Sequence, residues 1–195
     1  MLLDGEITLN KSSSYPYDRD DADITLRSSN DTLFKVHRII LVMASPVFAD
    51  MFSLPQPLTQ SATREQPVVD LTENGKTLRA LLDTCYPVAV ADLSDLDIVH
   101  SILQAAIKYD MPKSISLAKH ALRRFVLKEP LRVYAIACKL NLEQLAKAAA
   151  VQELAVCSRK QGYVKELNEI SAGCYHRLLQ YCKKRGDWEI GRAHV

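Results

Sequence analysis

A helix without a polar face is the feature that most constrains how this chain can fold. The stretch that contains it reads Phe34-Lys-Val-His-Arg-Ile-Ile-Leu-Val-Met-Ala-Ser-Pro-Val-Phe-Ala-Asp-Met-Phe52. Phe34 and Val36 alternate with polar residues, which is the period of a half-buried strand. After His37-Arg38, positions 39–43 are all apolar, so the helix they form must be buried nearly all round. A small sheet supplies only part of that cover, and we expect another polypeptide to supply the rest.

Ser45-Pro46 divides this helical region into two helices. Proline cannot donate a backbone hydrogen bond to a preceding turn, but its fixed φ suits the first position of a new helix. Ser45 can cap that helix, a role that contributes about 1 kcal/mol relative to alanine. The second helix then carries apolar residues inward, namely Val47, Phe48, Met51 and Phe52.

The rest of the chain indicates a small sheet clasped by helices. Ile24 and Leu26 alternate with polar residues, and turn residues at 28–31 connect them to Phe34, which predicts a β-hairpin with a loop of about four or five residues. Val68–Leu71 reads as a further strand. Several apolar helical stripes follow, one of them with Ser94 as its expected N-cap. The predicted fold class is α/β, in the α+β sense.

From Pro130 onward the periodicity is only helical. Asn141, with Gln144 three residues later, predicts the end of one helix and the cap of the next. Ser171 could cap a last helix that presents Tyr175 and Leu178. We therefore expect antiparallel helix pairs in this part of the chain.

The composition is that of an ordinary globular protein, with 195 residues, 48% of them apolar and 25% charged. A net charge of +2 gives no reason to expect nucleic acid or a membrane surface as a partner. No apolar run approaches the roughly 20 residues that span a bilayer, and the first residues lack the positive charge of a signal peptide. Five scattered cysteines then favour a reducing compartment, the cytoplasm or the nucleus.

The two ends of the chain are set apart from the fold. Residues 1–20 are polar and acidic, and we expect a flexible N-terminal segment there. Residues 190–195 are what ATC GGA AGA GCA CAC GTC would encode, a string that resembles a common sequencing adapter. We therefore expect the native protein to continue differently past about Glu189.

Catalytic, metal and nucleotide sites are poorly supported. Cys174 and Cys182 would lie about 12 Å apart on one helix, too far to share a zinc ion with His176. The glycines form no phosphate-binding fingerprint, and no nucleophile signature is present. Short basic runs such as Lys183-Lys-Arg185 are more typical of a solvated helix face than of a nucleic-acid footprint. We therefore expect no enzyme activity, no cofactor and no metal.

His37 and Arg38 are the informative polar pair. His37 at a strand end would ordinarily bond a nearby backbone group, and Arg38 would ordinarily be solvated. An arginine beside an apolar helix is more often accompanied by a counter-charge, and Asp23 on the neighbouring strand is the obvious candidate.

These residues resemble a known family. Asp23-Ile-Thr-Leu, the Phe34–Phe52 stretch and Leu81-Leu-Asp-Thr-Cys-Tyr86 together are similar to a BTB/POZ domain, and Leu103-x-x-Ala-x-x-Tyr-x-Met111 matches its second half. Ser53-Leu-Pro-Gln-Pro57 is further similar to short fungal BTB proteins. The resemblance implies a BTB/POZ domain over 21–127 and a helical extension with BACK-like helix pairs over 128–189.

The resemblance also implies function. In BTB dimers the first helix packs across a two-fold axis, and the residues matching Asp23 and Arg38 line a charged pocket there. The partner-binding candidates are therefore Asp23, His37, Arg38, Ile39 and Met43. The expected function is a non-catalytic protein–protein interaction module that forms homo- or hetero-oligomers.

The alternative is a substrate adaptor of a cullin-type ubiquitin ligase, with a cullin as partner. Such adaptors often carry a hydrophobic-x-Glu motif, but Pro87–Leu93 contains no glutamate. Many BTB domains also swap an N-terminal strand between subunits, and here only Ile7-Thr-Leu9 could supply one.

Overall fold

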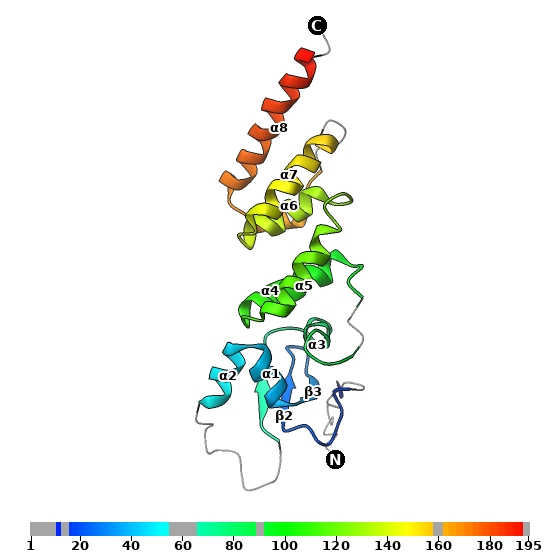
Figure 1. Ribbon diagram of the computed structural model, residues 1–195, viewed down its shortest axis with the longest axis vertical. Coiled ribbons are helices and arrows are strands. Elements are labelled where there is room, and N and C mark those ends of the chain that lie inside the picture. The colour runs from blue at the N-terminus through cyan, green and yellow to red at the C-terminus, as the bar shows by residue number, and fades with distance from the viewer. Residues whose placement is uncertain (1–10, 13–15, 55–65, 89–91, 158–161, 193–195) are drawn as a thin grey trace, which may run out of the picture. The chain divides into compact units, whose positions relative to one another are not determined.

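The computed structural model describes residues 11–12, 16–54, 66–88, 92–157 and 162–192. The expected strand Ile7–Leu9 and the last three residues of the expected adapter segment lie outside these ranges. The chain divides into two compact units, residues 1–118 and residues 119–195, which are described separately (Figure 1). No helix within the described ranges combines the length and the apolar composition that crossing a bilayer requires.

The sheet of the first unit is built around the predicted hairpin. Strand β2 (Ile24–Arg27) pairs antiparallel with β3 (Thr32–Val36), so that Leu26 lies opposite Phe34. In the described residues two short strands flank this hairpin in parallel, β1 (Lys11–Ser12) beside β3 and β4 (Val68–Asp70) beside β2. The order is β1-β3-β2-β4.

The loop between β2 and β3 follows from its turn residues. Ser28 Oγ accepts a hydrogen bond from the backbone N–H of Thr32 at 2.9 Å, and Asp31 adopts a positive φ of 59°. Short polar side chains such as aspartate tolerate that conformation better than branched ones do. The hairpin predicted from the alternation of Ile24 and Leu26 is confirmed.

Helices accompany this sheet in the described part of the first unit; the first three lie next to it, and the fourth packs against the third (Figure 1). They are α1 (Arg38–Ala44), α2 (Pro46–Ser53), α3 (Gly75–Asp83), α4 (Leu96–Lys108) and α5 (Pro112–Arg123), the last of which crosses the boundary between the units.

The break between α1 and α2 has the predicted cause. Ser45 has an extended backbone, and its hydroxyl accepts a hydrogen bond from Phe48 N at 3.1 Å, while Pro46 takes the first helical position. The same hydroxyl is buried and donates to the backbone oxygen of Tyr109. Ser45 therefore joins α2 to the end of α4.

The N-cap prediction for α4 was one residue early. The side chain of Asp95, not that of Ser94, accepts a hydrogen bond from the backbone N–H of Asp97 at the start of this helix. Ser94 is exposed and bonds to Asp92 instead. Both residues suit a cap, and the sequence pattern does not separate neighbouring candidates.

Residues 1–20 were expected to form a flexible segment, but Tyr17 within it is fully buried. Its ring packs edge-on against Phe34 and Tyr86, with centroids 5.7 and 5.2 Å away, and its hydroxyl donates to Asp83 Oδ1 at 2.7 Å. Burial raises the pKa of Tyr17, so the phenol keeps its proton and remains a donor. Tyr17 therefore connects the lead-in to α3.

We expect Tyr17→Phe to lower the free energy of unfolding of the first unit by about 1–3 kcal/mol, because the buried carboxylate of Asp83 loses its donor. Tyr163→Phe is the matched control, since that hydroxyl is on the surface and accepts from Asn168. Urea unfolding measures both. Equal effects of the two substitutions would show that the Tyr17–Asp83 bond contributes little.

The second unit is helical, as predicted. Its described elements are α6 (Pro130–Lys139), α7 (Glu143–Cys157), the short 3-10 helix η1 (Lys165–Glu169) and α8 (Ala172–Arg192). Asn141 follows α6 with a positive φ of 55°, which suits a helix end, but α7 begins only at Glu143, so Asn141 does not cap it. Ser171 accepts from Cys174 N at 3.2 Å and is the predicted cap of α8.

Candidate protein-interaction surface

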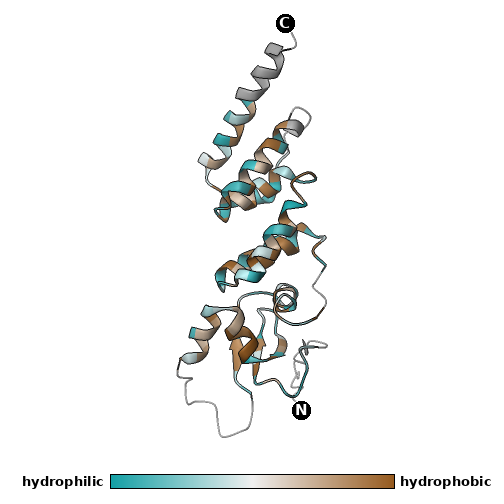
Figure 2. Ribbon diagram, viewed as in Figure 1, coloured by the Kyte–Doolittle hydropathy of each residue, from teal (hydrophilic) through white to brown (hydrophobic). Residues whose placement is uncertain are grey.

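Helix α1 leaves two of its apolar side chains largely exposed. Of its residues only Leu41 is buried, whereas Ile39 is 63% and Met43 is 82% exposed. Figure 2 shows α1 coloured as hydrophobic. The two exposed residues are four positions apart and therefore lie on one side of the helix. We call Ile39 and Met43 the α1 strip; the expectation that this helix is buried nearly all round is wrong within the chain.

The N-terminus of α1 is fixed by polar contacts from two other elements. Asp23 Oδ1 accepts a hydrogen bond from the backbone N–H of Arg38 at 2.7 Å. The hydroxyl of Tyr86, which follows α3, accepts from the backbone N–H of His37 at 2.8 Å. A carboxylate at a helix N-terminus satisfies a free N–H and complements the helix dipole. Together with buried Leu41, these bonds hold the α1 strip in a defined orientation.

Arg38 and Asp23 come together, but not as the expected ion pair. Both residues are described, and their side chains make no salt bridge with one another: Asp23 bonds the backbone of Arg38 instead. The guanidinium lies over the ring of Phe52, 5.1 Å from its centroid, and donates to the backbone oxygen of Phe52 at 3.4 Å. A weakly hydrated guanidinium stacks readily on an aromatic face, so Arg38 is held against α2.

His37 is half-buried and bonds side chains rather than the backbone group considered from the sequence. Its Nδ1 lies 3.2 Å from the hydroxyl oxygen of Tyr86, and its Nε2 lies 3.5 Å from Asp21 Oδ1. Hydrogen bonds from the guanidinium of Arg19 lower the pKa of Asp21 to about 2, so this carboxylate is ionised beside His37. The strip therefore has charged neighbours on the side of the helix N-terminus.

The geometry brings all five candidate residues into one region. Ile39 and Met43 form an exposed apolar centre, and Asp23, His37 and Arg38 lie at the helix N-terminus as a polar rim. An apolar centre with a polar rim is the usual anatomy of a protein–protein interface. Within the described residues no three histidine, cysteine or acidic side chains lie together as a metal-ion site.

Two contacts of this region were missed from the sequence. Phe52 was expected only as an inward-facing residue, yet it also supports Arg38. Tyr86 was named only as part of the family resemblance. Its hydroxyl contacts two atoms of His37, the backbone N–H and the ring Nδ1. Both partners are distant in the sequence from the residues they support, so no local period could indicate them.

A small α/β domain with such a surface is typical of protein-interaction domains. Among known families, the model of the BTB/POZ domain matches residues 16–125, more than half of the chain. The chain belongs to the BTB/POZ domain family, whose members are generally protein–protein interaction modules.

Other comparisons are more distant. Among solved structures, 61 chains match, and one of them is the BTB domain of zebrafish PATZ1. That domain is 19% identical, with a TM-score of 0.42, and the similarity covers 53% of this chain and 76% of the other. No curated protein matches the sequence.

Proposed function

We propose that this protein is a non-catalytic interaction module that self-associates through the α1 strip. The observation that carries the proposal is the exposure of Ile39 and Met43, at 63% and 82%, in a helix whose sequence has no polar face. An isologous interface would bring the strips of two copies together. The dimer would then bury Ile39 and Met43 from both copies, four side chains in all. The resemblance to BTB dimers, in which the first helix lies on the two-fold axis, supports the same surface.

The energetics favour a modest affinity. Burying an apolar side chain of this size contributes about 1.5–3 kcal/mol, so four such side chains in a dimer contribute roughly 6–12 kcal/mol. Association costs about 4–15 kcal/mol in lost freedom, which offsets from about a third to all of this gain. The polar rim of Asp23, His37 and Arg38 therefore has to add complementary contacts for a dimer to be stable.

Sedimentation velocity at several protein concentrations tests the proposal. We expect the sedimentation coefficient to rise from that of a monomer to that of a dimer, with a midpoint on the order of micromolar. A monomer at every concentration up to about 100 µM would remove self-association, because an interface this weak would not form at working concentrations.

We expect Arg38→Ala to weaken association roughly 5- to 30-fold, since arginine is enriched among the interface residues whose truncation costs more than about 1 kcal/mol. The monomer should remain folded, because Arg38 supports α1 mainly through its backbone N–H, which alanine retains. Lys76→Ala is the control, since Lys76 is an exposed cation on another helix of the same unit. Sedimentation measures the affinity and circular dichroism the fold; unfolding of Arg38→Ala would assign the residue a structural role instead.

A cullin adaptor is the second candidate function. It is favoured by the helical unit that follows the domain, where α6 packs against α7 and η1, since cullin adaptors of this family add similar helices. Co-purification with a cullin N-terminal domain distinguishes the candidates. No binding at tens of micromolar would retire the adaptor and leave self-association untouched.

A further inference from the structure

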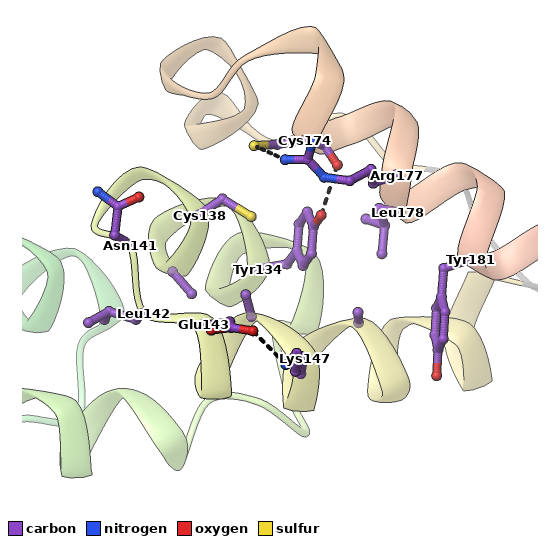
Figure 3. A pocket seen from close by; sticks show the side chains of 13 residues that line it. Tyr134, Cys138, Asn141, Leu142, Glu143, Lys147, Cys174, Arg177, Leu178 and Tyr181 are labelled. Carbon is purple, nitrogen blue, oxygen red and sulfur yellow. Dashed lines mark hydrogen bonds and ion pairs between the residues drawn. The ribbon is translucent and has the colours of Figure 1, made fainter.

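The second unit contains a cavity of about 510 Å³ between α6, α7 and α8 that has no part in the proposed interface (Figure 3). Two free cysteines line it, Cys138 near the end of α6 and Cys174 in the first turn of α8. Neither residue is fully buried, and both line the cavity. Their surroundings differ, and the two thiols are therefore expected to ionise differently.

Cys174 is surrounded by groups that stabilise a thiolate. Ser171 Oγ donates to its sulfur at 3.3 Å, and Arg177 Nη2 donates at 3.1 Å (Figure 3 draws the Arg177 contact). Cys174 also lies in the first turn of a long helix, where the free backbone N–H groups and the dipole favour negative charge. The bond from Ser171 and the charge of Arg177 lower the pKa of Cys174.

Tyr134, one helical turn before Cys138 on α6, contacts Cys174 and so brings the two cysteines to the same cavity. The hydroxyl of Tyr134 donates to the backbone oxygen of Cys174 at 2.8 Å, which ties the start of α8 to α6. Cys138 is four residues after Tyr134 and therefore lies on the same face of α6. Both side chains line the same cavity (Figure 3), and burial raises the pKa of Cys138, in contrast to the lowered pKa of Cys174. One sulfur thus ionises first and the other keeps its proton.

We propose that Cys138 and Cys174 are an oxidisable pair, in which Cys174 reacts with a hydroperoxide such as hydrogen peroxide and Cys138 then closes a disulfide. The thiolate of Cys174 attacks one peroxide oxygen, an S–O bond forms, the O–O bond breaks, and hydroxide leaves and is protonated to water. The sulfur of Cys138 then attacks the sulfenic acid. An S–S bond forms, the S–O bond breaks, and the departing hydroxide takes the Cys138 proton as a second water.

The atoms and electrons of these two reaction steps balance without any further reactant. Two thiols lose two electrons and two protons, and one peroxide is reduced to two molecules of water. The product covalently joins α6 to the N-terminal turn of α8. A thiol reductant such as glutathione reverses it by thiol–disulfide exchange.

Cys85 provides an internal reference. It is in the first unit, and no cation bonds its sulfur within the described residues. The charge of Lys113 acts to lower its pKa, but burial has the larger effect and raises the pKa. Its hydrogen-bonding neighbours are the hydroxyl of Thr84 and the backbone oxygen of Leu81. A thiol of raised pKa is a poor nucleophile at neutral pH, so Cys85 should react at least about tenfold more slowly than Cys174.

The test is treatment of the reduced full-length protein with about one equivalent of hydrogen peroxide, followed by alkylation and peptide mass spectrometry. We expect a peptide pair linked through Cys138 and Cys174, with Cys85 still reduced. In Cys138→Ser the sulfenic acid on Cys174 should persist and be trapped by dimedone, and in Cys174→Ser Cys138 should stay reduced.

Two further variants test whether the reactivity of Cys174 depends on Arg177 and whether Cys85 takes part. Arg177→Gln should slow the reaction of Cys174 about two- to tenfold, because the charge that favours the thiolate is lost. Cys85→Ser should leave the linked peptide unchanged. Equal oxidation of Cys85 and Cys174, or absence of the Cys138–Cys174 link while Cys174 oxidises, would overturn the proposal; neither result bears on the α1 strip.

Discussion

Replacing Ile39 and Met43 together by aspartate should convert the associated protein to monomers at all concentrations at which the unmodified chain is a dimer. Each substitution removes an exposed apolar side chain, at 63% and 82%, and puts a carboxylate in its place. Loss of the apolar burial alone is about 3–6 kcal/mol for each copy, which corresponds to at least a 100-fold weaker association. Placing like charges opposite one another across a two-fold axis weakens it further.

The matched control for this variant is Leu127→Asp with Val151→Asp. These residues are 72% and 52% exposed, and both belong to the second unit. The control has the same change in charge and also removes two exposed apolar side chains, so a general effect on solubility or self-repulsion is common to both proteins. Sedimentation of the two variants side by side measures the difference. Dimers of unchanged affinity in the strip variant would show that the interface lies elsewhere.

Leu41→Ala should lower the free energy of unfolding of the first unit by about 2–5 kcal/mol, because Leu41 is fully buried and truncation leaves a cavity. Met43→Ala, two residues later on the same short helix, should change it by less than about 0.5 kcal/mol, since its side chain touches solvent in the monomer. The two substitutions together compare the effect of the buried side of α1 on stability with that of its exposed side.

The measurement has to report on the monomer and on the first unit alone. Hydrogen exchange of the β2 and β3 amides, recorded below the dissociation constant, satisfies both conditions. Equal destabilisation by the two substitutions would mean that Met43 is covered by its own chain. The basis for an interface on α1 would then be lost.

The parts of the fold that local patterns determine were predictable. The hairpin follows from alternation at Ile24 and Leu26 and from the turn residues after Arg27, and the α1–α2 break follows from the properties of Ser45 and Pro46. Both depend on neighbours a few residues apart. The α/β class and the family were predictable because residue types and spacings over more than half the chain match the BTB/POZ pattern.

Contacts between distant segments were not predictable in the same way. Tyr17 belongs to a polar stretch, and only its packing against Phe34 and its bond to Asp83 make it a core residue. Asp23 was expected to meet the guanidinium of Arg38, but the free backbone N–H at the start of α1 was the nearer donor. A charge pattern indicates which residues meet and leaves open which of their atoms do.

The cysteines show the same limit. The sequence directed attention to Cys174 and Cys182 on one helix and to their spacing along it, and so to a metal site that this spacing disfavours. The neighbour that lies on the same cavity is Cys138, which belongs to a different helix and is brought there by the bond from Tyr134 to the backbone of Cys174. Nothing in the local sequence of α6 distinguishes Cys138 from a buried apolar cysteine.

Photo-crosslinking from position 43 tests most directly whether a second copy covers the exposed side of α1. Met43 is replaced by a photoreactive phenylalanine analogue, and protein of natural isotope content is mixed with uniformly ¹⁵N-labelled protein before irradiation. We expect crosslinked peptides that join one labelled and one unlabelled chain, with the reacted residue on α1 near Ile39. Crosslinks confined to a single chain, or none above the level seen with the analogue at Val151, would contradict the account.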